Sequence, residues 1–69
     1  MNEYPNMFKP ETGVTYKNHG GSEYRCLWSK NSEAGFINTR SRWRFTAHGC
    51  RMYKDGTIEW DYSTGGFFE

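Results

Sequence analysis

The stretch WRFTAHGCRMYKDGTIEWDY, residues 43–62, decides the fold of this chain. Apolar and polar side chains alternate along its first part, residues 43–48, and again along its last part, residues 58–62. A period of two is typical of strands that have one dry face and one wet face. We therefore predict two strands whose interior positions are Trp43, Phe45, Ala47, Ile58, Trp60 and Tyr62.

A turn at Asp55-Gly56 is expected to join these two strands. Both residue types adopt positive φ readily, and an Asp-Gly pair between alternating segments indicates a two-residue type I′ hairpin turn. Gly49 marks a bend or bulge that lets one long strand serve two sheet edges. The predicted turn sets three cross-strand pairs, which are Tyr53 with Ile58, Arg51 with Trp60 and Gly49 with Tyr62.

The remaining segments are predicted to be short strands joined by turns. Residues 1–12 carry both prolines and show no clean period, so we expect an irregular N-terminal arm followed by one small β domain over residues 13–69. At residues 32–34, one helical turn is the alternative to a polar turn. The other predicted strands cover residues 14–17, 22–29 and 34–39, with Tyr24, Cys26 and Trp28 on one face of the second.

The predicted architecture is all-β and mainly antiparallel. Five short strands linked by short turns favour a meander, and a strongly bent meander closes most readily into a small barrel of SH3-like or OB-like type. A flat sheet of three or four strands with a short helix across it is the alternative. The chain has 69 residues with three Trp, five Tyr and five Phe, so we expect a largely aromatic core.

Charge and hydropathy argue against some kinds of partner. A formal net charge of +1 gives no global field that would attract nucleic acid or an anionic membrane. No apolar run reaches membrane-spanning length and the polar N-terminus lacks the apolar centre of a signal peptide, so we expect a cytoplasmic protein. In that compartment the two cysteines are expected to be free thiols.

Two histidines and two cysteines form a weak candidate set for a metal site. Zinc needs its ligands within about 2.0–2.3 Å of one point, yet one of the cysteines belongs to a row assigned to the interior. No Cys-x-x-Cys pair is present either. We therefore expect no metal, no cofactor and no enzymatic activity. The residues of this set are His19, Cys26, His48 and Cys50.

A group of arginines is the candidate nucleic-acid surface. Residues 40–54 hold five basic and no acidic side chains. Proteins that bind single strands combine such cations with aromatic platforms on which bases stack. Glu59 and Asp61 are expected to lie beside this stripe and to neutralise part of it. The candidate residues are Arg25, Arg40, Arg42 and Arg44, with Tyr16 and Trp28 as stacking platforms.

Binding to another protein is nevertheless the function that the sequence favours. Tyr, Trp and Arg carry much of the energy of protein interfaces, and the chain is rich in them. The apolar residues at the two ends, Tyr4, Met7 and Phe8 and then Phe67-Phe68, either plug a barrel or meet a partner, which includes a second copy paired through a sheet edge. We expect a small interaction module, an inhibitor or adaptor of the phage or mobile-element type. A single-stranded RNA or DNA binder is the alternative.

Overall fold

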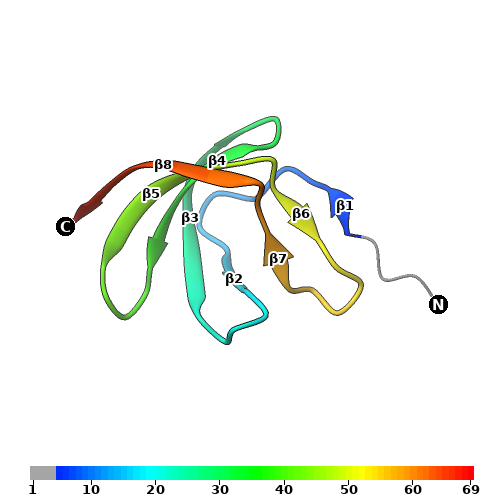
Figure 1. The fold of residues 1–69 in the computed structure, drawn as a ribbon, viewed down its shortest axis with the longest axis horizontal. Helices are drawn as coiled ribbons and strands as arrows, with labels where there is room; N and C mark the ends of the chain where they lie inside the picture. Colours follow the sequence, from blue (N-terminus) through cyan, green and yellow to red (C-terminus); the bar gives the residue numbers. More distant parts are fainter. Residues whose placement is uncertain (1–4) are drawn as a thin grey trace.

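Strands and turns build the whole described part of the chain, residues 5–69 of a computed structural model (Figure 1). Within these residues no helix occurs, and the strand pairs are antiparallel, which confirms the all-β prediction. A membrane-spanning helix is likewise absent from residues 5–69. The strands are β1 (Asn6–Met7), β2 (Thr15–Lys17), β3 (Glu23–Lys30), β4 (Glu33–Asn38), β5 (Trp43–His48), β6 (Arg51–Met52), β7 (Ile58–Glu59) and β8 (Tyr62–Phe68).

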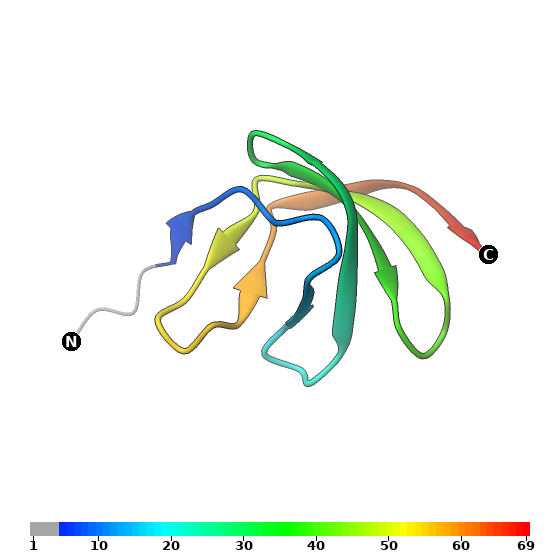
Figure 2. The ribbon, with the colours of Figure 1, turned by 180° about the vertical axis from the view of Figure 1, so that it is seen from behind.

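The strands form two sheets. One has five strands in the order β2-β3-β4-β5-β8, and the other has three in the order β1-β6-β7. Figures 1 and 2 show the β6–β7 hairpin and the end of β8 at opposite ends of the long axis. A parallel bridge between Asn18 and Ile58 also links the two sheets. Neither sheet closes into a barrel, and β2 and β8 are the outer strands of the larger one.

The N-terminal arm contributes a strand to the smaller sheet. β1 pairs with β6 in antiparallel fashion. Met7 is exposed, whereas Phe8 packs against the core and its amide donates a hydrogen bond to Cys50 O at 3.2 Å. Tyr4, which was considered with these residues as an apolar end, lies outside the described residues.

A sharp corner divides the long hairpin that runs from β5 through β6 and returns through β7 to β8. Gly49 lies at this corner with a φ of +75°, a conformation that favours glycine. A Cβ at Gly49 would collide with the carboxylate of Asp61, whose amide donates to His48 O at 2.8 Å. The predicted bend is therefore confirmed, and it lets one hairpin serve both sheets.

The turn of this hairpin differs from the predicted one. Gly56 has a φ of +90°, but Asp55 does not adopt positive φ. Instead, the Asp55 carboxylate accepts hydrogen bonds from the amide and the hydroxyl of Thr57, at 2.9 and 2.6 Å. Because the Tyr53 amide donates to Thr57 O, the loop spans residues 54–56. This is the geometry of a type I turn followed by a glycine bulge.

The longer loop shifts the strand register by one residue, so none of the three predicted pairs forms. Arg51 lies opposite Glu59, and Tyr62 lies opposite His48, each one position away from the predicted partner. Ile58 keeps its predicted interior position, whereas Tyr62, beyond the corner, stacks on His48 and is 60% exposed, so its predicted interior position is wrong.

The polar turn predicted after the second strand is confirmed, and its alternative, a helical turn at residues 32–34, does not form. Asn31 and Ser32 form a tight turn between β3 and β4, while Lys30 and Glu33 already lie opposite each other at the strand ends. Asn31 has a φ of +54°, which asparagine tolerates better than most residues. The local preference of asparagine for this conformation thus favours a hairpin here.

A bulge in β3 changes the direction of Trp28. The register against β4 shifts between Cys26 and Trp28. Cys26 consequently faces the core, whereas the Trp28 indole lies over Gly35 on the opposite face and fills the space that a Cβ there would occupy. Trp28 therefore does not share the interior row of Tyr24 and Cys26, because a bulge reverses the alternation of a strand.

Aromatic rings pack at the centre of the core. Phe36 is fully buried and stacks on Trp60 with ring centroids 5.7 Å apart. Phe45 lies 6.0 Å from Phe36. Trp43 also faces inward, as predicted, but it lies near the open end of the sheet and is 37% exposed. The core cluster consists of Cys26, Ala34, Phe36, Phe45, Ala47, Cys50 and Ile58.

Replacing Phe36 with alanine is expected to lower the free energy of unfolding by about 3–5 kcal/mol, because a buried ring is removed from among its aromatic neighbours. A loss of this size is comparable to the total stability of a small domain. Urea denaturation followed by circular dichroism measures the change.

The matched control is Trp43→Ala. Its indole keeps more than a third of its surface in water, so the expected loss is smaller, about 1–2 kcal/mol. Equal destabilisation by the two variants would contradict the placement of Phe36 at the centre of the core.

Candidate functional site

The five-stranded sheet has two faces with different side chains. We call the face that carries Phe36 and Phe45 the inner face, and the face that carries Ile37 and Arg44 the outer face. Trp60 and the smaller sheet cover part of the inner face. On the outer face, the strand register places a row of residues side by side across all the strands, namely Thr15, Arg25, Ile37, Arg44 and Phe67.

The structure separates the candidate arginines into two groups. Arg25 and Arg44 belong to the outer-face row, and Trp28 lies on the same face. Arg40 and Arg42 instead lie in the loop between β4 and β5, where Arg42 has a φ of +67°. The predicted arginine stripe therefore lies partly on the outer face of the sheet and partly in the loop between β4 and β5.

Tyr16, the second predicted stacking platform, lies on the inner face. It is opposite Tyr24 in the register, and its ring packs edge-on against Phe36 with centroids 6.3 Å apart. Its hydroxyl accepts a hydrogen bond from the Glu11 amide at 2.9 Å. Tyr16 therefore flanks the core, and of the two predicted platforms only Trp28 accompanies the outer-face arginines.

Glu69 is the ionic partner of two of the candidate arginines. Its carboxylate forms ion pairs with Arg42 Nη2 and, at 2.8 Å, with Arg44 Nη2. The hydrogen bond from Arg44 holds the pKa of Glu69 below its ordinary value. The Arg44 Nε atom is buried and has no hydrogen-bond partner among residues 5–69. The single negative charge of Glu69 therefore balances only one of the two positive charges of this pair.

The two acidic residues expected beside the arginines have other partners. Arg51 Nη1 donates to Asp61 Oδ1 at 2.7 Å. The Tyr53 hydroxyl donates to Glu59 Oε1 at 2.7 Å, and this bond raises the pKa of Tyr53. Arg42 and Arg44 therefore pair with Glu69, which follows β8, and not with Glu59 or Asp61.

The candidate metal ligands do not converge. His19 lies in the turn after β2 and His48 at the end of β5, whereas Cys26 and Cys50 are buried in the core. Within residues 5–69, no group of three or more His, Cys, Asp or Glu side chains is placed to hold a metal ion. The fold therefore does not bring together all four residues that the sequence suggested as metal ligands.

Burial suppresses the chemistry of both thiols. It raises the pKa of Cys50 to about 11 and also raises that of Cys26. The thiolate is the reactive form, so burial favours the unreactive thiol form of both side chains at neutral pH. A nucleophilic or metal-binding role for these cysteines is therefore not supported.

A chromogenic disulfide reagent is expected to leave both cysteines unmodified in the folded protein at neutral pH and to react with both after unfolding in guanidinium. Absorbance at the two conditions gives the number of accessible thiols. Fast reaction of the folded protein would contradict the burial of Cys26 and Cys50.

The inner face opens into a cleft that alternation alone does not reveal. Its volume is about 350 Å³. Trp43, Phe45 and Trp60 are recognisable from the sequence as inward-facing, but the cleft exists because the sheet above them stays open. We call it the aromatic cleft, and it is lined by Tyr24, Asn38, Ser41, Trp43, Phe45, Trp60, Ser63 and Phe68.

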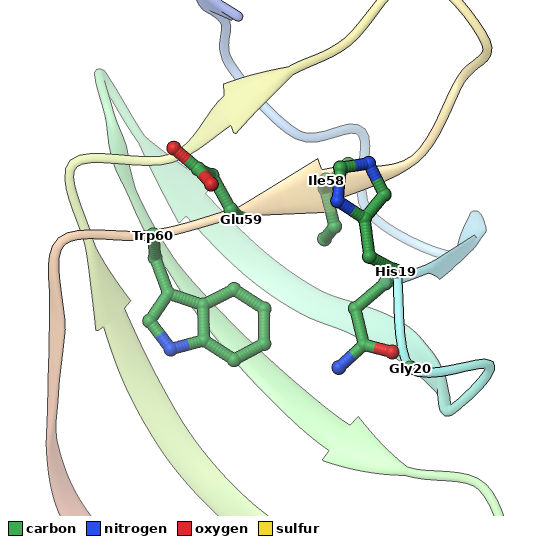
Figure 3. A pocket seen from close by; sticks show the side chains of 6 residues that line it. His19, Gly20, Ile58, Glu59 and Trp60 are labelled. Carbon is green, nitrogen blue, oxygen red and sulfur yellow. The ribbon is translucent and has the colours of Figure 1, made fainter.

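A smaller hollow of about 260 Å³ also borders Trp60 (Figure 3). His19 and Glu59 line it and are the residues that acid–base chemistry would require there. Figure 3 shows the Glu59 carboxylate and the Trp60 indole pointing to opposite sides of the chain. Tyr53 donates to Glu59 and packs against the His19 ring at 4.3 Å, so the carboxylate is held by a tyrosine.

β8 is an outer strand, and all seven of its residues are exposed. Phe67 and Phe68 have exposed fractions of 57% and 65%. Phe68 packs against Trp43 with centroids 4.7 Å apart, and the Trp43 indole covers Gly66. Exposed aromatic side chains therefore gather along one open sheet edge.

No protein-family model, curated protein or solved structure matches this chain. The candidate functional surfaces are therefore identified from the structure alone. They are the β8 edge, the aromatic cleft and the outer face.

Lowering the pH is expected to release Glu69 from its arginines. Its pKa is lowered in the folded state, so the interaction stabilises the fold above the pKa of an unfolded glutamate, about 4.3, and this stabilisation is lost as the pH falls through the lower folded value. Urea unfolding between pH 7 and pH 2 measures it. Glu69→Gln should remove this part of the pH dependence, and an unchanged profile in that variant would contradict the assignment.

Proposed function

We propose that this protein is a non-enzymatic interaction module, an inhibitor or adaptor, that binds another protein by accepting an extended segment of it along β8. The supporting observation is that β8 is an outer strand of seven residues, all of them exposed. An outer strand presents N–H and C=O groups on its free side, and these groups can pair with an added strand.

The side chains around β8 suit such a partner. Phe67 lies next to Arg44 on the outer face, and Phe68 lies next to Trp43 on the inner face. An added strand presents its side chains alternately to the two faces of the sheet, so each set would meet an aromatic residue. Aromatic and arginine side chains are also the ones that most often dominate binding energy at interfaces.

Two features of β8 restrict which segment can pair with it. Residues 62–68 carry no charge, and the flanking carboxylates of Asp61 and Glu69 are already paired with arginines. Gly65, with a φ of +63°, accompanies a register irregularity in the pairing with β5. Such an irregularity twists an edge and discourages indiscriminate strand addition. A specific partner is therefore favoured over open-ended assembly.

The SH3-like or OB-like barrel also remains a proposal. It is supported by the bent hairpin that serves both sheets and by the bridge between Asn18 and Ile58 that brings their edges together. Small barrels of these types are built from bent antiparallel strands shared between two sheets.

Proline substitutions on β8 test the proposed function. Successive N–H groups of an antiparallel strand alternate between the neighbouring strand and the free side. Ser63 and Thr64 are neighbours, so one of their N–H groups faces β5 and the other faces the free edge. Proline at the position whose N–H faces β5 disturbs pairing with β5, whereas proline at the other position removes only a free-edge N–H. The two substitutions to compare are Ser63→Pro and Thr64→Pro. The variant that keeps the wild-type melting temperature is expected to lose at least about tenfold in affinity, measured calorimetrically against a partner captured from cell lysate and then purified.

Thr15→Pro, on the opposite outer strand β2, is the matched control and should leave the affinity unchanged. Full binding by the stable β8 variant would contradict strand addition. If the partner is a second copy of this chain, sedimentation analysis will detect the dimer. A dimer that the stable proline variant abolishes would identify a homodimer paired through this edge.

Binding of single-stranded RNA or DNA is the second candidate function. The observation in its favour is that Arg25, Arg44 and Trp28 share the outer face, although Glu69 compensates the charge of Arg44. Filter binding of a labelled oligouridylate tests it. Binding through phosphates should weaken by roughly 0.7 log units per log unit of salt for each contact. Salt-independent affinity, or no effect of Arg25→Glu, removes this candidate.

A further inference from the structure

The aromatic cleft has the size and lining of a ligand site. Its volume of about 350 Å³ lies at the lower end of the range that is typical of such sites, roughly 300–1,000 Å³. Among the described residues, no Asp, Glu, Lys, Arg or His lines it. An ionised group entering the cleft would lose hydration without gaining a counter-charge. The part of a ligand that enters must therefore be uncharged.

Contacts between rings hold the walls of the aromatic cleft in place. Tyr24 packs edge-on against Phe45 at 5.5 Å and against Trp60 at 5.2 Å, both with an interplanar angle of 87°. On the other side, Trp43 packs against Phe68 at 4.7 Å. The walls are thus formed before a ligand arrives, and binding does not have to order them.

Two polar residues at the rim, Asn38 and Ser41, are left mainly with donors, whereas the Tyr24 and Ser63 hydroxyls both donate and accept. Asn38 Oδ1 accepts hydrogen bonds from the amides of Arg40 and Ser41, at 2.9 and 3.0 Å, so the NH₂ group is the part left for a ligand. Ser41 Oγ accepts from the Trp43 amide at 3.3 Å, which leaves its hydroxyl hydrogen to donate. The indole N–H groups of Trp43 and Trp60 can only donate. A matching ligand must supply acceptors.

Backbone strain is present in the loop that carries this rim. Arg42 has a φ of +67°, which is unfavourable by about 1–2 kcal/mol for a residue with a side chain. Its amide donates to Asn38 O at 2.9 Å, and its guanidinium pairs with Glu69. These bonds hold the loop in a conformation that presents Asn38 and Ser41 to the cleft. Residues with strained backbone conformations of this kind are common at binding sites.

We propose that the aromatic cleft binds a proline-rich protein segment in the polyproline II conformation. Such a segment brings uncharged, flat rings to the aromatic walls and free carbonyl acceptors to the donors, and its prolines have no N–H that would need an acceptor. Sugars and nucleobases also carry acceptors and can stack on aromatic walls, so a glucan oligomer and an oligouridylate are the competing ligands in the test. The site goes beyond the proposed strand addition, because its ligand is different and it occupies a cleft of the inner face, although both surfaces include Phe68.

A capped decaproline peptide is the probe, and isothermal titration calorimetry is the measurement. Wild-type protein is expected to bind it saturably and to leave a glycine–serine peptide of equal length unbound. Trp43→Ala should weaken binding by at least about tenfold. Trp28→Ala is the matched control, because each indole is partly exposed and covers a glycine, but Trp28 lies on the outer face. Its affinity should stay within about twofold of wild type.

Asn38→Asp tests the role of the donors without truncating a ring. It keeps an oxygen for the Arg40 and Ser41 amides and replaces the NH₂ donor with a second oxygen, so the loop should persist while affinity falls at least about tenfold. Absence of saturable decaproline binding overturns the proposal. Equal losses in Trp43→Ala and Trp28→Ala, or tighter binding of a glucan oligomer or an oligouridylate, also overturn it.

Phe67→Ala separates this proposal from strand addition along β8. Phe67 does not line the aromatic cleft, so this variant should bind decaproline like the wild type while its affinity for a strand-forming partner decreases. Loss of decaproline binding in Phe67→Ala would count against the cleft as the binding site.

Discussion

The stack of Trp60 on Phe36 is the contact on which the rest of the structure depends. Their ring centroids lie 5.7 Å apart, and the corner at Gly49 makes this approach possible by turning the hairpin back across its own sheet. A straight hairpin would leave Phe36 facing water. In a chain this small, with few aliphatic residues, burying aromatic surface in this way supplies the main stabilisation of the fold.

The same arrangement leaves part of the sheet uncovered. The smaller sheet and Trp60 shield only a portion of the inner face, and away from the shared hairpin the two sheets meet at the bridge from Asn18 to Ile58. The unshielded portion forms the aromatic cleft, and β8 has no neighbouring strand beyond it in the sheet order. The aromatic cleft and the free edge of β8 therefore both exist because the sheet does not close on itself.

Local patterns in the sequence predict the strands and the bend, whereas the register and the sites depend on contacts that these patterns do not contain. Alternation and Gly49 suffice for the bent hairpin. The length of its turn depends on the hydrogen bonds from Thr57 to Asp55, which compete with a type I′ turn. The direction of Trp28 depends on a bulge, and the partners of Glu69 lie far away in the chain. The aromatic cleft requires knowledge of the whole sheet.

The three tryptophans lie in three different environments. Trp28 covers a glycine on the outer face, Trp43 borders the aromatic cleft, and Trp60 packs against the core. Indole emission shifts to the red as its surroundings become more polar, so the two partly exposed tryptophans and the packed one differ in their spectra. The natural sequence thus already contains optical reporters for its outer face, for the rim of the cleft and for the wall that the cleft shares with the core, without any attached dye.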